Sequence, residues 1–227
     1  PSFVPRIDNS VLPLYFRHGY IPTPWSVWSG IRKVIPGSYL TVRASDRGVL
    51  PVPKSFWSFP EMIIHCQSNP LFCTDKEAID ALESSLINSL ERQMIADVPL
   101  GSFLSGGIDS STVVALMQSI SSTPVKTFTI SFSEVSHNES VYASSIAHYL
   151  GTHHTEHIVT AEQALDVIPM LPLIYDEPFG DSSAIPTYLV SKLARNDVSV
   201  SLSGDGGDEL FGGYSRYFNR RSYQSWK

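Results

Sequence analysis

Basic residues, cysteines and long hydrophobic runs are all scarce in this chain of 227 residues. Only 16 Lys and Arg stand against 22 Asp and Glu, giving a formal net charge of -6, and no basic cluster interleaves with aromatic residues. This balance argues against a nucleic-acid partner. No apolar run is long enough to cross a bilayer, and no secretion signal opens the chain, so we expect no membrane partner and a cytoplasmic location.

The cysteine content points the same way. Cys66 and Cys73 are the only two cysteines, so a disulfide framework of the kind that holds small secreted domains together is excluded. A local bridge between the two is disfavoured in a reducing compartment. Their spacing also lacks the close pairing of a zinc knuckle.

The residues up to Phe59 differ in character from the rest of the chain. This segment is rich in proline and tryptophan and contains short β-like runs such as residues 39–42. It predicts strands and turns without a core of its own, and no amphipathic helix of convincing length precedes Thr74. We therefore expect residues 1–59 to be the β-rich tail of an N-terminal domain whose beginning is absent.

Residues 60–227 read as a second domain in which strands and helices alternate. Thr74 and Glu77 form a capping-box pattern ahead of apolar residues that are spaced for one helix face. Strands are expected over 99–104, 125–132, 155–159 and 198–202, and helices over 109–119, 139–150, from 161 onward and over 184–195. This alternation predicts an α/β fold, a parallel sheet with helices on both faces.

A glycine- and serine-rich loop, Ser105 to Ser111, follows the first of these strands and leads into a helix. Gly106 and Gly107 lack Cβ atoms, so backbone N–H groups can close on an anion, and the helix adds the positive end of its dipole. Hydroxyl groups on three serines supply further donors. The loop is therefore interpreted as a pyrophosphate cradle.

A second loop, Ser203 to Glu209, also combines glycines with carboxylates after a β-rich run. In open α/β sheets, ligands bind beyond the carboxyl ends of the strands, so the two loops are expected to meet in one cleft. Asp109 and Asp208 could then hold Mg²⁺ together, because this ion needs few carboxylates beside phosphate oxygens and water. The competing interpretation is that each aspartate caps a helix.

No lysine follows the glycines as it does in a Walker A loop, so a γ-phosphate clamp of that kind is missing. Such a cradle suits an enzyme that cleaves ATP between the α and β phosphates and releases pyrophosphate as a unit.

The sequence from Leu104 to Ser111 resembles the pyrophosphate loop of the N-type ATP pyrophosphatases, and the chain looks most like the glutamine-hydrolysing asparagine synthetase family. Three further stretches carry the resemblance: Tyr175 to Ser183, Ser203 to Tyr214, and Arg17 to Pro22 together with Pro36-Gly37. The fold this implies is that of the adenine nucleotide alpha hydrolases. The activity implied is carbon-nitrogen ligation, in which an acceptor carboxylate attacks the α-phosphate of ATP and ammonia displaces AMP.

The resemblance also implies roles for particular residues. Asp205 matches an acidic position that assists proton removal from ammonia, and Tyr214 matches a tyrosine near the leaving pyrophosphate; a packing role for Tyr214 stays open. Leu104 and Ile130 match positions that flank the adenine. The predicted ATP and pyrophosphate contacts are Leu104, Ser105, Gly106, Gly107, Asp109, Ser110, Ser111, Ile130, Ser203 and Gly204, with Mg²⁺ on Asp109 and Asp208.

The other substrates are less sharply indicated. Asp181, Ser182 and Ser183 are predicted to meet the acceptor acid, although their loop offers no arginine for a substrate carboxylate. The resemblance implies ammonia from glutamine, made by an N-terminal cysteine in a glutaminase domain. This chain is expected to retain only the end of that domain and a synthetase domain that stops early. A homodimer is left open.

Several alternatives remain. His153, His154 and His157 invite a zinc interpretation, but on a strand His154 points away from the other two, so a structural role is favoured. Trp25 and Trp28 are expected to be packed rather than to form a ligand platform. At the level of function, the alternatives are a nucleotide-binding or assembly module without turnover, and another ATP pyrophosphatase such as a β-lactam-forming or RNA-thiolating enzyme.

Overall fold

The computed structural model describes residues 4–46, 48–132, 140–214 and 217. It divides the chain into two compact units, described separately below. Pro1–Cys73 and Pro169–Ser182 form the first, and Thr74–Ile168 and Ser183–Lys227 form the second. The predicted boundary near residue 59 stays a prediction.

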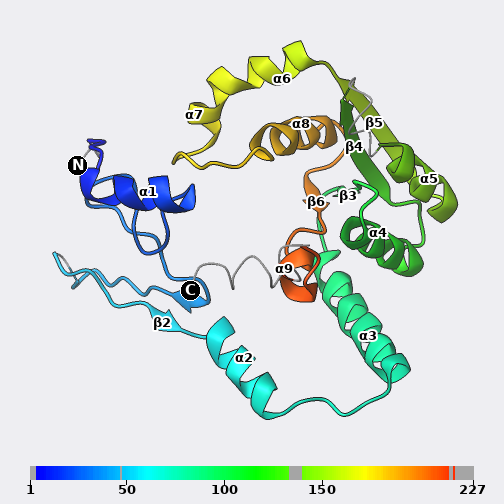
Figure 1. Ribbon diagram of the computed structural model, residues 1–227, viewed down its shortest axis with the longest axis horizontal. Coiled ribbons are helices and arrows are strands. Elements are labelled where there is room, and N and C mark those ends of the chain that lie inside the picture. The colour runs from blue at the N-terminus through cyan, green and yellow to red at the C-terminus, as the bar shows by residue number, and fades with distance from the viewer. Residues whose placement is uncertain (1–3, 47, 133–139, 215–216, 218–227) are drawn as a thin grey trace, which may run out of the picture. The chain divides into compact units, whose positions relative to one another are not determined.

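The second unit holds the predicted alternation of strands and helices (Figure 1). Its elements are α3 (Asp75–Gln93), β3 (Leu100–Phe103), α4 (Ile108–Ile120), β4 (Lys126–Phe132), α5 (Ser140–Leu150), β5 (His153–Val159), α6 (Ala161–Val167), α8 (Ala184–Ala194), β6 (Val200–Leu202) and α9 (Gly207–Phe211). The capping box at the start of α3 is confirmed, because the Thr74 hydroxyl accepts from the Glu77 N–H while the Glu77 carboxylate accepts from the Thr74 N–H. All four strand starts differ from prediction: β3 and β4 begin one residue later than expected, β5 begins two residues earlier and β6 two residues later.

The four strands of this unit form one parallel sheet in the order β5-β4-β3-β6. From β3 the chain winds outward through β4 to β5 and then returns to place β6 on the other side of β3. The winding direction therefore reverses between β3 and β6. This reversal is a topological switch point, where α/β sheets open a crevice at the carboxyl ends of their strands.

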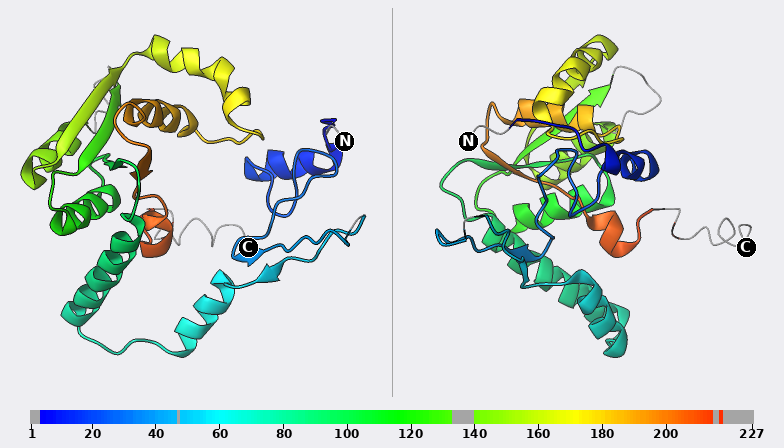
Figure 2. Two further views of the ribbon diagram at one scale, coloured as in Figure 1. Left: turned by 180° about the vertical axis from the view of Figure 1, so that it is seen from behind. Right: turned by 90° about the vertical axis from the view of Figure 1, so that its left-hand side faces the viewer.

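Helices cover both faces of the sheet, as predicted (Figure 2). On one face Leu104, which is 1% exposed, packs with Val114 of α4 and with Ala143 and Ala147 of α5. On the other face Phe128 of β4 packs against α8. The strands thus direct alternate side chains into two separate apolar layers.

The first unit corrects the sequence-based expectation. It contains η1 (Asn9–Val11), α1 (Leu12–His18), β1 (Ser38–Tyr39), β2 (Lys54–Ser55) and α2 (Phe59–Ser68), with η3 (Ile168–Met170) and α7 (Leu171–Ile174) leading into and forming its second segment. Two helices therefore lie where only strands and turns were expected. Both begin with a proline in the first turn, where its missing N–H costs nothing, and such short helices lack the long periodicity used for prediction.

The first unit also has a small core, which the sequence did not reveal. Val11, Ile21 and Val27 are buried together, and Leu14, Tyr15 and Trp28 pack against them. The three buried residues come from η1 and from irregular segments, whereas Leu14 and Tyr15 belong to the short helix α1, so no long helix or strand period marks this core. Tertiary contacts, and not local pattern, assemble this cluster.

The polar face of β5 predicts a loss of stability in acid. His154 is half-buried and its Nδ1 lies 2.9 Å from the Thr127 hydroxyl. Burial lowers the pKa of His154, an effect that the charge of Glu156 partly opposes. The pKa of Glu156 is itself lowered, first by a hydrogen bond from the Ser140 side chain and further by the hydroxyls of Ser131 and Ser144.

His154 and Glu156 both lower the free energy of unfolding as the pH falls, because the unfolded chain binds their protons more readily than the folded chain does. The His154 contribution is present above the ordinary histidine pKa of 6.5 and is lost as the pH falls through the lowered value. The Glu156 contribution is lost below its ordinary value of 4.5. We expect His154→Gln to flatten the fall in unfolding temperature between about pH 7.5 and about pH 5.5, whereas the same change at the exposed His148 leaves it intact. An unchanged slope in His154→Gln would show that this histidine does not titrate on unfolding.

Candidate functional site

The first glycine loop joins β3 to α4 at the switch point. Gly107 is the N-cap of α4 and supplies no side-chain cap, so the first N–H groups of this 13-residue helix keep their donors open. Gly106 has φ +84° and a Cβ there would lie 2.8 Å from Cβ of Tyr142 in α5. The loop therefore needs glycine for both its backbone angle and its close approach to α5, and it presents an uncapped helix end of the kind that binds anions.

Serine side chains hold this loop from the inside. The buried Ser110 hydroxyl accepts from the Ser105 N–H at 3.2 Å and lies 3.0 Å from the Ser105 hydroxyl. The Ser111 hydroxyl donates to the Gly107 carbonyl at 2.6 Å. All three hydroxyls thus fix the shape of the loop, which keeps the backbone N–H groups aimed at one place.

The second glycine loop meets the first. A Cβ placed on Gly204 would lie 2.6 Å from the Ser110 nitrogen, and one on Gly207 would lie 2.4 Å from Oδ2 of Asp109. Two segments about a hundred residues apart are therefore in van der Waals contact at the carboxyl ends of β3 and β6, as the parallel topology requires. The expectation that the two loops meet in one cleft is confirmed.

Asp109 and Asp208 do not cap helices. Gly107 is the N-cap of α4 and Gly206 that of α9, and neither aspartate occupies a cap position. The Asp109 carboxylate lies against Gly207, the residue directly before Asp208. Within the described residues, neither carboxylate forms a hydrogen bond or an ion pair. Both are therefore available as oxygen ligands, a donor set that suits Mg²⁺ when phosphate oxygens complete the coordination.

Two hollows flank the meeting point of the loops. One, of about 340 Å³, is lined by Asp109 together with residues 203–207 and by apolar side chains of α3 and α9. The other, of about 160 Å³, is lined by Leu104, Ser105 and Ile130 and, from α8, by Pro186 and Thr187. Leu104 and Ile130, the residues predicted to flank a base, thus share an apolar slot that opens beside Ser105.

The two predicted catalytic residues lie on the second loop. Asp205 is exposed and lines the hollow that also contains Asp109; its N–H donates to the Ser203 hydroxyl at 3.3 Å. Tyr214 donates its hydroxyl hydrogen to Glu209 at 2.8 Å and its ring meets Tyr217 edge to face. Asp205 therefore shares a hollow with Asp109, whereas Asp208, whose Oδ1 lies against Gly213, does not line it. The hydroxyl of Tyr214 is oriented by Glu209, an acidic neighbour that the sequence pattern did not single out.

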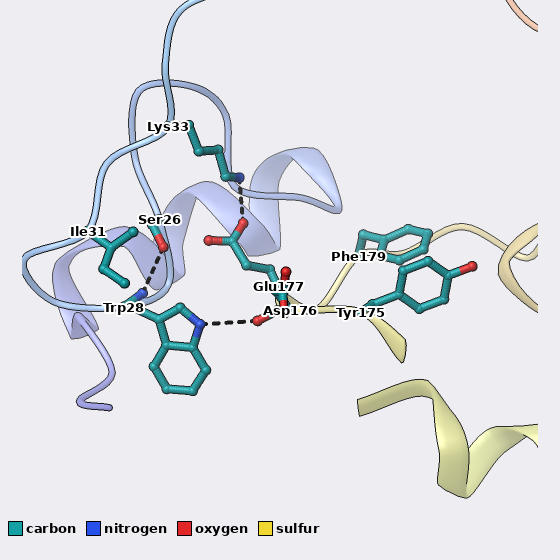
Figure 3. Close-up of a pocket in the computed structure, with 8 residues that line it drawn as sticks. All are labelled: Ser26, Trp28, Ile31, Lys33, Tyr175, Asp176, Glu177 and Phe179. Atoms are coloured by element: carbon teal, nitrogen blue, oxygen red, sulfur yellow. Dashed lines mark hydrogen bonds and ion pairs between the residues drawn. The ribbon is translucent and has the colours of Figure 1, made fainter. Parts of the chain in front are cut away.

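The predicted acceptor segment belongs in part to the other unit. Asp181 and Ser182 fall in the first unit, and Ser183 begins the return of the chain to α8. Just before them, Glu177 forms an ion pair with Lys33 (Figure 3). Glu177 also accepts the Val27 N–H at 2.8 Å. The Lys33 ammonium is therefore a cation beside this segment, although the segment itself contains no arginine. Lys33 escaped prediction because it lies in a distant irregular stretch, and no local pattern links it to Glu177.

Two side chains outside the site correct or extend the sequence-based view. Trp28 is half-buried against the small core, as expected for packing, whereas Trp25 is 41% exposed with the Arg32 guanidinium 4.2 Å over its ring. The prediction of packing is therefore wrong for Trp25, whose surface is shielded by a cation and not by a core.

Cys66 and Cys73 are free and exposed. No helix in the described part of the chain has the length and apolar character needed to span a membrane.

Fold and site together define an α/β domain with a parallel sheet and two glycine loops in contact at its switch point. The asparagine synthase family model matches residues 81–227, and the chain belongs to this family. A putative glutamine-hydrolysing asparagine synthetase 2 of Methanocaldococcus jannaschii is 36% identical over 215 residues, which cover 94% of this chain and 40% of that protein. Glutamine-hydrolysing asparagine synthetase 1 of Bacillus subtilis is 32% identical over 212 residues, covering 93% of this chain and 32% of that protein.

The chain therefore spans less than half the length of these relatives. Among solved structures, a glutamine-dependent NAD+ synthetase from Acinetobacter baumannii aligns with a TM-score of 0.42 and 21% identity over 64% of this chain and 28% of that chain. A TM-score at this level establishes no shared fold. The α/β architecture rests on the sheet itself.

Proposed function

We propose that the protein of which this chain is a part is an ATP-dependent amide-forming ligase of the asparagine synthetase type. An acceptor carboxylate attacks the α-phosphate of ATP, which forms an acyl-adenylate and pyrophosphate. Ammonia then attacks the acyl carbon and AMP leaves. The observation that carries this proposal is the contact between the two glycine loops, because it brings an anion-binding helix end and the Asp109 carboxylate to one crevice.

The loop geometry supports an assignment of the nucleotide subsites. The apolar slot at Leu104 and Ile130 would hold the adenine ring, with Ser105 at its rim toward the phosphates. Backbone N–H groups of Gly106, Ile108 and Asp109 would receive the pyrophosphate, whereas that of Gly107 donates to the Ser105 hydroxyl at 3.3 Å. Ser203 and Gly204, packed against Ser110, would close the crevice from the second loop.

Asp109 and Asp208 would hold Mg²⁺, which neutralises charge that builds up on the departing pyrophosphate. Asp205, exposed in the same hollow, is positioned to accept a proton from the attacking ammonia. Tyr214 would lie near the leaving pyrophosphate, with its hydroxyl hydrogen directed at Glu209. Membership of the family and the position of Asp109 and Asp205 in one hollow support these roles.

The acceptor is an organic acid, with aspartate the first candidate, held in part by Asp181, Ser182 and Ser183. Because Lys33 is already paired with Glu177, it does not supply a cation to the acceptor carboxylate, so that cation comes from elsewhere in the protein. Ammonia would be supplied from glutamine. The free thiols of Cys66 and Cys73 agree with a cytoplasmic location.

Product analysis tests this proposal directly. Full-length protein is incubated with Mg²⁺, ATP, ammonia and a panel of acids, and nucleotide and phosphate products are quantified. Equal amounts of AMP, pyrophosphate and amide support the proposal. ATP binding without cleavage would indicate a binding module, and ADP as product would exclude cleavage between the α and β phosphates.

A further inference from the structure

The segment that leads to the predicted acceptor residues is anchored to the first unit at several points, and Glu177 is central among them. Its Oε1 accepts the Val27 N–H at 2.8 Å, and its other oxygen pairs with the Lys33 ammonium. A hydrogen bond from Ser26 adds a further donor. We call Glu177 and its three partners, Ser26, Val27 and Lys33, the Glu177 clamp; Figure 3 draws Glu177, Ser26 and Lys33.

Neighbouring contacts extend the anchorage on either side of Glu177. The Asp176 carbonyl accepts the Trp28 Nε1–H at 3.1 Å, and the Gly180 N–H donates to the Gly19 carbonyl at 2.6 Å. Tyr175 and Phe179 stack edge to face with their ring centroids 4.7 Å apart. Residues 176–180 are therefore fixed at both ends, and Asp181 and Ser182 follow at once.

The charge state of Glu177 shows that this arrangement favours the carboxylate. Burial alone raises the pKa of Glu177, but hydrogen bonds from Lys33, Ser26 and Val27, together with the charge of Lys33, lower the pKa below its ordinary value. Lys33 is itself held in place, because its ammonium also donates to the Ile21 carbonyl at 2.7 Å. An ion pair taken partly out of water adds little stability but does specify one arrangement, since each charge needs its own partner.

We propose that Glu177 is a positioning residue, which fixes residues 176–180 on the first unit and thereby presents Asp181 and Ser182 to the acceptor acid. The inference rests on the proposed function and adds to it a residue that does not touch ATP. The clamp thus acts on the acceptor alone. Ser26, Val27 and Lys33 belong to the first unit together with residues 176–182, so the clamp and the two residues that it positions lie in one unit.

The test compares Glu177→Gln with Glu91→Gln, a matched control on the exposed face of α3, in the full-length protein. Gln keeps the size of the side chain and one oxygen for the Val27 N–H but removes the charge that pairs with Lys33. Because members of one hydrogen-bonded network couple strongly, KM for the acceptor is expected to rise about tenfold in Glu177→Gln. The dissociation constant for Mg-ATP is expected to stay within about twofold, as in the control.

Lys33→Met provides a second route to the same pair and protects the test against a folding defect in one variant. If the two residues act together, Lys33→Met raises acceptor KM as well. The acceptor KM of the double variant then does not exceed that of the more impaired single variant. Amide hydrogen exchange over residues 176–182 gives a readout independent of catalysis, and it should accelerate in both variants.

If amide exchange accelerates while the acceptor KM is unchanged, Glu177 has only a structural role and the inference is overturned. No change in either the exchange rate or the acceptor KM would also overturn it. A weakened affinity for Mg-ATP equal to the rise in acceptor KM would also overturn it, because the effect would then be global. If the wild-type protein forms no AMP with any acid, the proposed function fails and the inference fails with it. A changed variant beside an active wild type therefore separates the two claims.

Discussion

Replacing Gly204 with alanine should slow nucleotide cleavage about a hundredfold while leaving the sheet folded. The new Cβ would lie 2.6 Å from the Ser110 nitrogen and 2.8 Å from the Asp109 carbonyl carbon. Both are backbone atoms in the first turn of α4, so neither can rotate away as a side chain would. The second loop must retreat, and a displacement of about 1 Å at a reacting centre costs roughly a hundredfold in rate. Steady-state AMP formation in the full-length protein measures the loss.

Gly30→Ala is the control for this experiment. Gly30 has φ +80°, a conformation that strains an alanine, yet nothing lies within 4 Å of the added methyl group. It therefore carries a backbone penalty of about 1 kcal/mol without any contact with the glycine loops. Cleavage by Gly204→Ala at the level of Gly30→Ala would show that the two loops do not need their close contact.

Asp109→Asn is expected to have an effect of similar size, but one that shows a metal signature. The substitution keeps the shape of the side chain against Gly207 and removes its negative charge. Since a bound metal supplies several kcal/mol to charge stabilisation, AMP formation should fall about a hundredfold or more, and the Mg²⁺ concentration needed for half-maximal rate should rise. Titrating Mg²⁺ at fixed ATP checks both quantities.

Asp208→Asn should reproduce this shift, because the second loop is expected to supply the other ligand. Asp166→Asn, on an exposed turn of α6, serves as the charge-matched control and should leave the Mg²⁺ dependence unchanged. A lower rate with an unaltered Mg²⁺ requirement in both site variants would remove these aspartates from the metal site.

Much of the second unit could be predicted because its signals are local. The capping box of α3 and the two glycine loops can each be recognised from a few consecutive residues. The parallel topology then brings the loops together. The contact of Gly204 with Ser110 follows from these two facts. Sequence pattern could not decide whether Asp109 caps α4, because an aspartate near a helix start suits either role until the cap residue is located.

The first unit shows the opposite case. Its helices α1 and α2 are short and open with proline, so they leave little periodic signal. The Lys33–Glu177 pair joins an irregular stretch to a segment far along the chain, and neither residue carries a motif. The small core around Ile21 is built in the same way. Long-range contacts between irregular segments are what a single sequence does not disclose.

The central claim is that the two converging loops form one site for reversible cleavage of ATP at the α-phosphate. Exchange of labelled pyrophosphate into ATP tests it most directly, because an acyl-adenylate returns to ATP only if pyrophosphate is held in the same crevice. We expect exchange in full-length protein that requires both Mg²⁺ and an acceptor acid, proceeds without ammonia, and falls about a hundredfold in Gly204→Ala. Release of ADP with no exchange under any acceptor would contradict it.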